Sequence, residues 1–271
     1  MPELPEVETV KNGLLELGLK GKKIEEIVFL SPGLRNEFPT EIPDLFREAK
    51  IKNLHRRAKY ILFETDRGVL LSHLGMTGTW RKEPADFEKR KHDHIEIHFP
   101  RFVIVYNDPR RFGFFDSYES MQTDNPYLGH LGPEPLSEDF EHDYLWSKSR
   151  KRSASVKNFI MDQRIVVGVG NIYACEALFR TGVRPQKQAG KLSRNTYEIL
   201  VGHIKDILNE AIASGGSTIS DFKQAGGDSG YFQHDFKVYA REKEPCVVCG
   251  KAIKNEKLGG RSSFYCPSCQ S

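Results

Sequence analysis

The stretch YILFETDRGVLLSH, residues 60–73, contains two apolar runs, Tyr60–Thr65 and Val69–His73, separated by the turn residues Asp66–Gly68. Short runs that are rich in aliphatic and aromatic side chains and end at Gly, Asp or Pro are typical of β-strands. Similar runs occur at Ile24–Leu30, His94–Phe99, Phe102–Tyr106 and Phe112–Asp116. Many short strands at this spacing predict a β-sandwich or a β-barrel.

A helix is predicted ahead of these strands, over Pro5–Leu17. Its apolar side chains recur at steps of three and four residues, which is the period of one helix face. Pro5 suits the first turn, Glu6 and Glu8 suit the positive end of the helix dipole, and Gly18 suits the stop.

The pattern changes near Gly132–Pro135. Residues Ser137–Ser214 lack alternation and are predicted to be helical, with Thr196–Ala213 as the clearest case. The Gly- and Ser-rich segment Gly215–Gly230 is predicted to be a long flexible loop, and loops of that length are usually functional. The chain is therefore predicted to be α+β, with a β-rich first half, a helical region and a Cys-rich end.

The composition is that of a globular protein of 271 residues with a formal net charge of +3. It contains no run of about 18 apolar residues, so no membrane span is predicted. The N-terminus MPELPEVETVKNG lacks the apolar core of a secretory signal, which predicts a cytoplasmic protein.

Basic residues gather in Lys50–Arg67, Lys148–Arg164 and Lys237–Ser271. They are expected either to form a face that binds a polyanion or to be solvated surface charge.

Four of the five cysteines form two C-x2-C pairs separated by 16 residues: Cys246, Cys249, Cys266 and Cys269. Two such pairs predict a tetrahedral site for one Zn²⁺ ion, and a cytoplasmic setting disfavours disulfides. Four thiolates leave no position for water, so the zinc is expected to be structural. Arg261 and three lysines between the pairs predict a nucleic-acid contact. Cys175 is expected to be a small buried residue.

Two turn-like segments interrupt the strand-rich region, His73–Gly78 and Asn107–Gly113. By default, Met76 in the first and Phe112 in the second are core residues. The functional alternative is a wedge. A protein that extrudes a base from DNA must fill the space that the base leaves, and Met, Phe and Arg are suitable inserts.

The segment Val167–Asn171, VGVGN, precedes a predicted helix over Ile172–Arg180. Glycines let backbone N–H groups converge, and the start of a helix adds partial positive charge, a combination that binds phosphate. A plain structural turn is one alternative. A dinucleotide site is another, but it lacks the third glycine and a preceding βαβ pattern.

The motifs together resemble the bacterial formamidopyrimidine-DNA glycosylases, also called 8-oxoguanine-DNA glycosylases and AP lyases. They are PELPEVET at the start, HRRAKY around Lys59, SHLGMTG around Met76, NDPRRFG around Arg110, GVGNIYACEALF around Asn171, and the terminal CVVC and CPSC. The resemblance runs from end to end, and several independent motifs in the family's order are more specific than any one alone.

The resemblance implies an N-terminal β-sandwich flanked by helices over residues 1–133. It implies a helix–two-turn–helix DNA-binding domain with a lesion-capping loop over 134–235, and a four-cysteine zinc finger over 236–271. The implied enzyme is a monomer that binds double-stranded DNA with oxidised bases or abasic sites in a cleft between two halves. It excises 8-oxoguanine and formamidopyrimidines and cleaves the strand by β,δ-elimination.

The resemblance assigns the chemistry to a few residues. Pro2, which becomes N-terminal once Met1 is removed, is the implied nucleophile. Glu3 handles protons, and Glu6 is a second active-site carboxylate. Lys59 belongs to the same catalytic group and grips a phosphate near the lesion.

The implied DNA contacts surround the lesion. Asn171 and Arg261 grip phosphates. The space left by the flipped base is filled by three side chains, Met76, Arg110 and Phe112. The loop Ser217–Tyr231 closes over the base.

Other assignments depend on less specific matches. His92 is implied as a weaker DNA contact, with a solvated histidine in the charged run KRKHDH as the alternative. Lys157 is implied as a DNA-binding residue, but Asn158 follows it where some relatives have proline. Ser220 lies where some relatives have a basic residue, which leaves the base contacts of the loop undetermined.

A terminal proline suits the implied chemistry because it is a secondary amine. An α-amino group has a pKa near 8, so roughly a tenth is uncharged at pH 7 and can attack a sugar carbon. The product is an iminium, as in Schiff-base catalysis by lysine. Helix initiation is the structural alternative for Pro2, Glu3 and Glu6.

Two other functions remain open. An enzyme of the endonuclease VIII type, which prefers oxidised pyrimidines, has the same proline nucleophile and zinc finger. PELPEVE and the arginine–phenylalanine pair of NDPRRF favour the purine enzyme. A non-catalytic zinc-ribbon DNA-binding protein is the alternative from another class, and the presence of Pro2 and Glu3 disfavours it.

Overall fold

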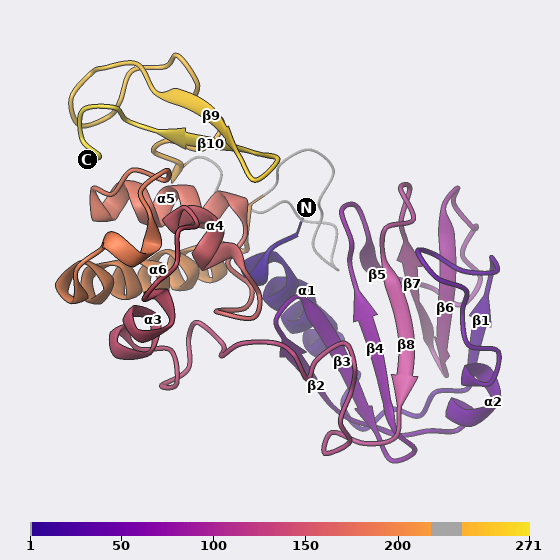
Figure 1. The fold of residues 1–271 in the computed structure, drawn as a ribbon. Coiled ribbons are helices and arrows are strands. Elements are labelled where there is room, and N and C mark those ends of the chain that lie inside the picture. The colour runs from indigo at the N-terminus through magenta and orange to yellow at the C-terminus, as the bar shows by residue number, and fades with distance from the viewer. Residues whose placement is uncertain (1, 218–234) are drawn as a thin grey trace. The chain divides into compact units, whose positions relative to one another are not determined.

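The computed structural model describes residues 2–217 and 235–271 (Figure 1). These residues form two compact units. The first consists of residues 2–129 and 214–217, and the second of residues 130–213 and 235–271. Most of the predicted loop Gly215–Gly230 and of the capping segment Ser217–Tyr231, with Ser220, lies outside the described residues.

The first unit contains two antiparallel four-stranded sheets (Figure 1). The strand orders are β1-β6-β7-β5 and β2-β3-β4-β8. The strands are β1 (Glu26–Phe29), β2 (Ile51–Arg57), β3 (Tyr60–Thr65), β4 (Val69–His73), β5 (Thr79–Glu83), β6 (Asp93–Phe99), β7 (Phe102–Asn107) and β8 (Phe114–Tyr118).

Both sheets contribute side chains to one core. Strand β7 inserts Phe102, Ile104 and Tyr106, and β3 of the other sheet inserts Ile61 and Phe63. Every second residue points into the core because side chains alternate along a strand. Two separate sheets around a shared core form a β-sandwich. Of the two predicted architectures, the fold is therefore the sandwich and not the β-barrel.

Each of the six predicted strands overlaps an observed one, but β2 and β5 are not predicted. Their sequences, IKNLHRR and TWRKE, are largely polar. Leu54 and Trp80 are buried, while several of their neighbours are partly or fully exposed. An antiparallel strand with one solvated face needs few apolar residues, so these two strands lack an apolar run.

Helix α1 (Leu4–Glu16) confirms the predicted N-terminal helix, and the short helix α2 (Ile42–Phe46) is not predicted. Three side chains one turn apart, Val7, Val10 and Leu14, pack from α1 into the core of the sandwich. This packing fixes the N-terminal residues against the sheets.

The second unit is helical and ends in a β-hairpin. Its elements are α3 (His142–Ser149), α4 (Val156–Met161), α5 (Asn171–Thr181), a 3₁₀ turn (Ala189–Lys191), α6 (Arg194–Ala213), β9 (Lys254–Leu258) and β10 (Arg261–Tyr265). The predicted helix Thr196–Ala213 corresponds to α6, and Cys175 is fully buried on α5, as predicted. Within the described residues, no helix is both long enough and apolar enough to cross a membrane.

Candidate functional site

The N-terminal end of α1 carries two buried carboxylates. The exposed fractions of Glu3 and Glu6 are both 2%. Pro2, which directly precedes Glu3 in the chain, is also buried. Glu3 is the N-cap residue, and its backbone N–H donates to Glu6 Oε2 at 2.8 Å. Helix capping explains this hydrogen bond. Capping does not explain why both carboxylates are buried, and the burial of a carboxylate is costly.

The second oxygen of Glu6 binds a residue far away in the sequence. The backbone N–H and the hydroxyl of Ser217 donate to Glu6 Oε1 at 2.8 and 2.9 Å. A Cβ atom on Gly216 would lie 3.2 Å from the Glu6 side chain. The Glu6 carboxylate therefore accepts hydrogen bonds from Glu3 at one oxygen and from Ser217 at the other, and these keep both oxygens in place.

Lys59 lies in the two-residue connection between β2 and β3, and its side chain is buried. The preceding Ala58 has a φ of 53°. Arg56 donates from Nη1 to the Ala58 carbonyl oxygen at 2.9 Å and from Nε to Glu8 Oε2 of α1 at 2.7 Å. Arg56 thus holds the turn of Lys59 against the helix that follows Pro2.

His73 is a residue of this site that the sequence patterns do not single out. It is paired with Tyr60 across β3 and β4, next to Lys59. Desolvation, with smaller effects from the positive charges of Lys59 and Arg35, lowers the pKa of His73 to about 4. Its Nδ1 accepts the N–H of Gly75 at 3.0 Å, which leaves the ring proton on Nε2. The SHLGMTG motif contains this residue, but the prediction made from that motif concerns Met76 alone.

A neutral His73 makes the stability of the first unit depend on pH. Between pH 6.5 and 4 the unfolded chain binds the proton and the folded protein does not, so stability falls as the pH falls. Between pH 7 and 5 we expect a loss of up to about 2 kcal/mol. His73→Asn, which keeps an acceptor for Gly75, should reduce this loss in urea denaturation. His98→Gln on β6 is the control, and an equal pH dependence in His73→Asn would contradict the assignment.

Met76 and Phe112 are exposed, with exposed fractions of 37% and 47%. The interpretation of both as core residues is therefore wrong. Asp108 connects their turns: its Oδ1 accepts the Thr77 hydroxyl at 2.5 Å, and its Oδ2 accepts the Gly113 N–H at 2.8 Å. The turns also touch, since a Cβ atom on Gly75 would lie 2.4 Å from the carbonyl carbon of Phe112.

Arg110 and Arg111 have different surroundings. Both residues are exposed, and the guanidinium carbon of Arg110 lies 4.9 Å from the centroid of the Phe112 ring. Arg111 has a φ of 55° and donates from Nη2 to the Gly33 carbonyl oxygen at 2.5 Å. Arg111 therefore fixes the loop, and Arg110 is presented to solvent with the exposed ring.

His92 adjoins the same turn. Its φ is 72°, and its carbonyl oxygen accepts the backbone N–H of Asp108 at 3.0 Å. The imidazole is partly exposed. The structure thus brings His92, Met76, Arg110 and Phe112 together on adjoining turns of the first unit.

In the second unit, the glycine-containing turn leads into α5 as predicted. Gly168 has a φ of 76°, Gly170 is the N-cap residue and Asn171 begins the helix. The element that leads into this turn is the helix α4 and not a strand, so the βαβ context of a dinucleotide site is missing. A phosphate site and a structural turn both remain compatible with it.

The hairpin of β9 and β10 presents Arg261 next to this turn. Asn171 Nδ2 donates to the Ser262 carbonyl oxygen at 3.0 Å. Lys157 Nζ donates to the same oxygen at 2.9 Å and to Ser263 Oγ at 2.7 Å. Lys157 is fully buried, so a direct DNA contact by this residue is not supported. Arg261 is exposed and forms no ion pair with any carboxylate of the described residues.

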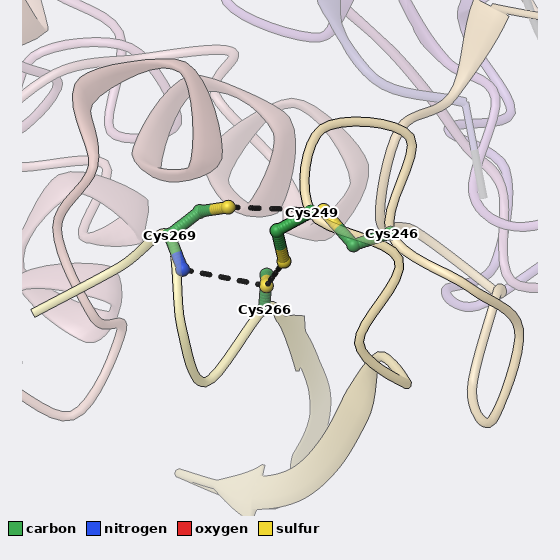
Figure 2. A group of neighbouring side chains, drawn as sticks. All are labelled: Cys246, Cys249, Cys266 and Cys269. Carbon is green, nitrogen blue, oxygen red and sulfur yellow. Dashed lines mark hydrogen bonds between the residues drawn. The ribbon is translucent and has the colours of Figure 1, made fainter.

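The four cysteines of the terminal module converge (Figure 2). Their sulfur atoms lie within 4.8 Å of one another. Cys246 and Cys269 have sulfurs 3.9 Å apart, and those of Cys249 and Cys266 are 3.5 Å apart. Tetrahedral zinc with Zn–S bonds of about 2.3 Å requires sulfur separations of about 3.8 Å. The donor set therefore fits one structural zinc ion, which holds the ends of the β9–β10 hairpin.

Three family models match consecutive parts of the chain. The formamidopyrimidine-DNA glycosylase N-terminal domain matches residues 1–115, and the formamidopyrimidine-DNA glycosylase H2TH domain matches residues 131–223. The zinc finger found in FPG and IleRS matches residues 243–271. Together the models cover most of the chain.

Individual relatives match over their full length. The formamidopyrimidine-DNA glycosylase of Bdellovibrio bacteriovorus is 50% identical over 273 residues, which is 100% of both chains. The Lactococcus lactis FPG mutant G226P, solved with a Fapy-dG containing DNA, is 34% identical, with a TM-score of 0.92 and 100% of both chains covered. The L. lactis protein with DNA containing an abasic site has a TM-score of 0.91 at 34% identity, with 99% of each chain covered.

Proposed function

The chain belongs to the formamidopyrimidine-DNA glycosylase family, and on that premise we propose that it excises 8-oxoguanine and formamidopyrimidines from duplex DNA and then cleaves the strand. The observation that carries the proposal is the start of α1, where Pro2 directly precedes the buried carboxylates of Glu3 and Glu6. A terminal secondary amine beside a buried acid–base group is what a lyase needs to bond to a sugar and move protons.

In the proposed reaction, the uncharged nitrogen of Pro2, freed by removal of Met1, attacks C1′ of the damaged nucleotide. The glycosidic bond breaks, and the base leaves with its electron pair and takes up a proton. The bonded Pro2 nitrogen loses its proton, and its lone pair then cleaves the C1′–O4′ bond, with a proton passed to O4′, to give an iminium between Pro2 and C1′. The iminium acidifies the C2′ protons, so β-elimination expels the 3′ phosphate and a second elimination expels the 5′ phosphate.

We assign the proton transfers to Glu3, because it follows Pro2 in the chain and is buried. Glu6 suits this task less well, since its oxygens already accept hydrogen bonds from Glu3 and Ser217. Its proposed role is to hold the backbone of these two residues. Lys59 supplies the positive charge for a phosphate near the lesion, and Arg56 keeps its turn against α1.

The remaining DNA contacts are proposed from both units. Asn171 and Arg261 grip phosphates, and His92 adds a weaker contact. The structural zinc acts through the hairpin that carries Arg261 and takes no part in the chemistry. We propose that the enzyme acts as a monomer, with domain boundaries near residues 133 and 235.

Cleavage of two duplexes, run side by side, tests the proposed substrate. One carries 8-oxoguanine opposite cytosine and the other an oxidised pyrimidine, and borohydride is added to trap the iminium. We expect faster cleavage of the 8-oxoguanine duplex and a covalent protein–DNA adduct. Faster cleavage of the pyrimidine duplex would indicate an endonuclease VIII-like activity, and DNA binding without an adduct would indicate a non-catalytic protein.

Arg110 is proposed to read the base opposite the lesion. Its guanidinium has several donors and no acceptor. An unpaired cytosine presents the adjacent acceptors O2 and N3, whereas adenine presents N1 beside an N6 amino donor. Adenine therefore loses one hydrogen bond and brings two donors together, a mismatch worth about ten- to hundredfold in rate.

Arg110→Ala is accordingly expected to slow excision opposite cytosine and to reduce the preference for cytosine over adenine. Met76→Ala should slow excision opposite both bases alike, because a wedge only fills space. Arg111→Ala is the matched control, since its guanidinium is bound to Gly33. Single-turnover excision on both duplexes measures these effects. Arg110 is not the reader if Arg110→Ala keeps the full preference.

A further inference from the structure

The turn that precedes Arg261 packs against a residue of α4. Gly259 and Gly260 form the two-residue connection between Leu258 and Arg261, which pair across β9 and β10. Their φ values are 55° and 80°. Two positive φ values in a two-residue hairpin loop are typical of a type I′ turn. The side chain of Asn158 lies against this turn: a Cβ atom on Gly259 would be 2.7 Å from Asn158 Nδ2.

The position of Asn158 is itself fixed. Asn158 lies in the first turn of α4, and the N-cap residue Ser155 accepts its backbone N–H at 3.3 Å. Its amide side chain makes no hydrogen bond with any residue that the structure describes. The contact with Gly259 is therefore a packing contact, and it does not depend on a hydrogen bond.

The backbone on the other side of Arg261 is held by hydrogen bonds. The Ser262 carbonyl oxygen accepts both Lys157 Nζ and Asn171 Nδ2, and Ser263 Oγ accepts Lys157 Nζ as well. Because Lys157 is fully buried, its hydrogen bond to Ser263 is shielded from water, whereas the bond from Asn171 to Ser262 is exposed. Arg261 is thus an exposed cation whose backbone is held on both sides.

We propose that Asn158 is a positioning residue that, with Lys157 and Asn171, presets the backbone of Arg261 for its phosphate. The inference rests on the DNA role of Arg261 given under the proposed function. An isolated two-stranded hairpin is only marginally stable, so a cation at its tip would otherwise sample many positions. Holding the turn removes the entropy cost of ordering it on binding.

A double-mutant cycle tests this coupling. The affinity for a duplex with a tetrahydrofuran abasic analogue is measured for Asn158→Ala, Arg261→Ala and the double variant. If Asn158 acts through Arg261, its single replacement should weaken binding by about three- to tenfold, in the range of coupled neighbours. The double variant should bind no more weakly than Arg261→Ala alone.

Two further variants separate positioning from other roles. Asn158→Leu keeps the branched shape without the amide and should bind within about twofold of the native protein, whereas a direct contact between the amide and DNA would weaken it as much as Asn158→Ala. Asn195→Ala, in the first turn of α6, is the matched control with an exposed asparagine. Zinc content and melting temperature are measured for every variant, so that unfolding is recognised.

The outcomes distinguish the inference from its premise. Native affinity in Arg261→Ala would remove the DNA role of Arg261. Native affinity in Asn158→Ala beside a weakened Arg261→Ala would overturn the positioning role alone. Losses that multiply in the double variant, or a weakened Asn158→Leu, would do the same.

Discussion

Pro2→Gly is expected to slow base excision at least about a hundredfold in single turnover, because a displacement of the nucleophile by about 1 Å lowers the rate by about that factor. The variant keeps a terminal amine but loses the ring that fixes its φ angle and the direction of its lone pair. Lesion binding should be almost unchanged, since phosphate contacts supply most of the affinity for DNA. The measurements are single-turnover excision of 8-oxoguanine and the dissociation constant for the same duplex.

A preparation that retains Met1 should show a larger loss. The nitrogen of Pro2 is then a tertiary amide without a nucleophilic lone pair, so no borohydride adduct should form. Pro5→Ala is the matched control, because Pro5 lies in the first turn of α1, close to Pro2 in the chain, and does not become the terminal residue when Met1 is removed. Undiminished trapping in protein shown by mass spectrometry to retain Met1 would refute the nucleophile assignment.

Cys249→Ser is expected to abolish zinc binding and to weaken DNA binding strongly. The hairpin between the two cysteine pairs has only two strands, and such a hairpin is marginal without the metal. Cys246 and Cys266 also pack with Cys175 and Phe179 of α5, so loss of the metal should loosen that contact. Loss of an ordered hairpin around Arg261 is expected to weaken the affinity for DNA about tenfold or more, as for a lost charge-assisted hydrogen bond.

The first unit provides an internal reference for this variant. Its core contains none of the cysteine module, so its urea midpoint should change little. Cys175→Ala is the control: it removes a buried thiol that is not a ligand and should leave the zinc content at one ion. Native DNA affinity in a zinc-free Cys249→Ser protein would be incompatible with a structural role for the metal in binding.

Much of the fold could be predicted because its pattern is local. The strands β3 and β4 are apolar runs with a turn between them, and the cysteine spacing alone predicts the metal site. The strands β2 and β5 could not be predicted, because one solvated face leaves too few apolar residues. Short polar strands of this kind are defined by pairing with neighbours, which a single sequence does not display.

The site was predictable only where a motif carries its chemistry. The contact between Glu6 and Ser217 joins residues far apart in the chain, and no spacing rule predicts it. The lowered pKa of His73 arises from enclosure beside Lys59, which depends on the pairing of β3 with β4. The resemblance implies a DNA contact for Lys157, and a lysine in a basic stretch is usually exposed. Its burial under Ser262 requires the folded hairpin.

The carboxylate of Asp108 has a consequence for how this protein can be redesigned. It accepts hydrogen bonds from Thr77 and from Gly113, so the turns that carry Met76 and Phe112 share one anchor. In a chimera that takes only one of the two turns from another protein, the foreign turn has to pack against the native second turn, with which it did not evolve. The two turns form one cassette for grafting, and recombination has to move both together.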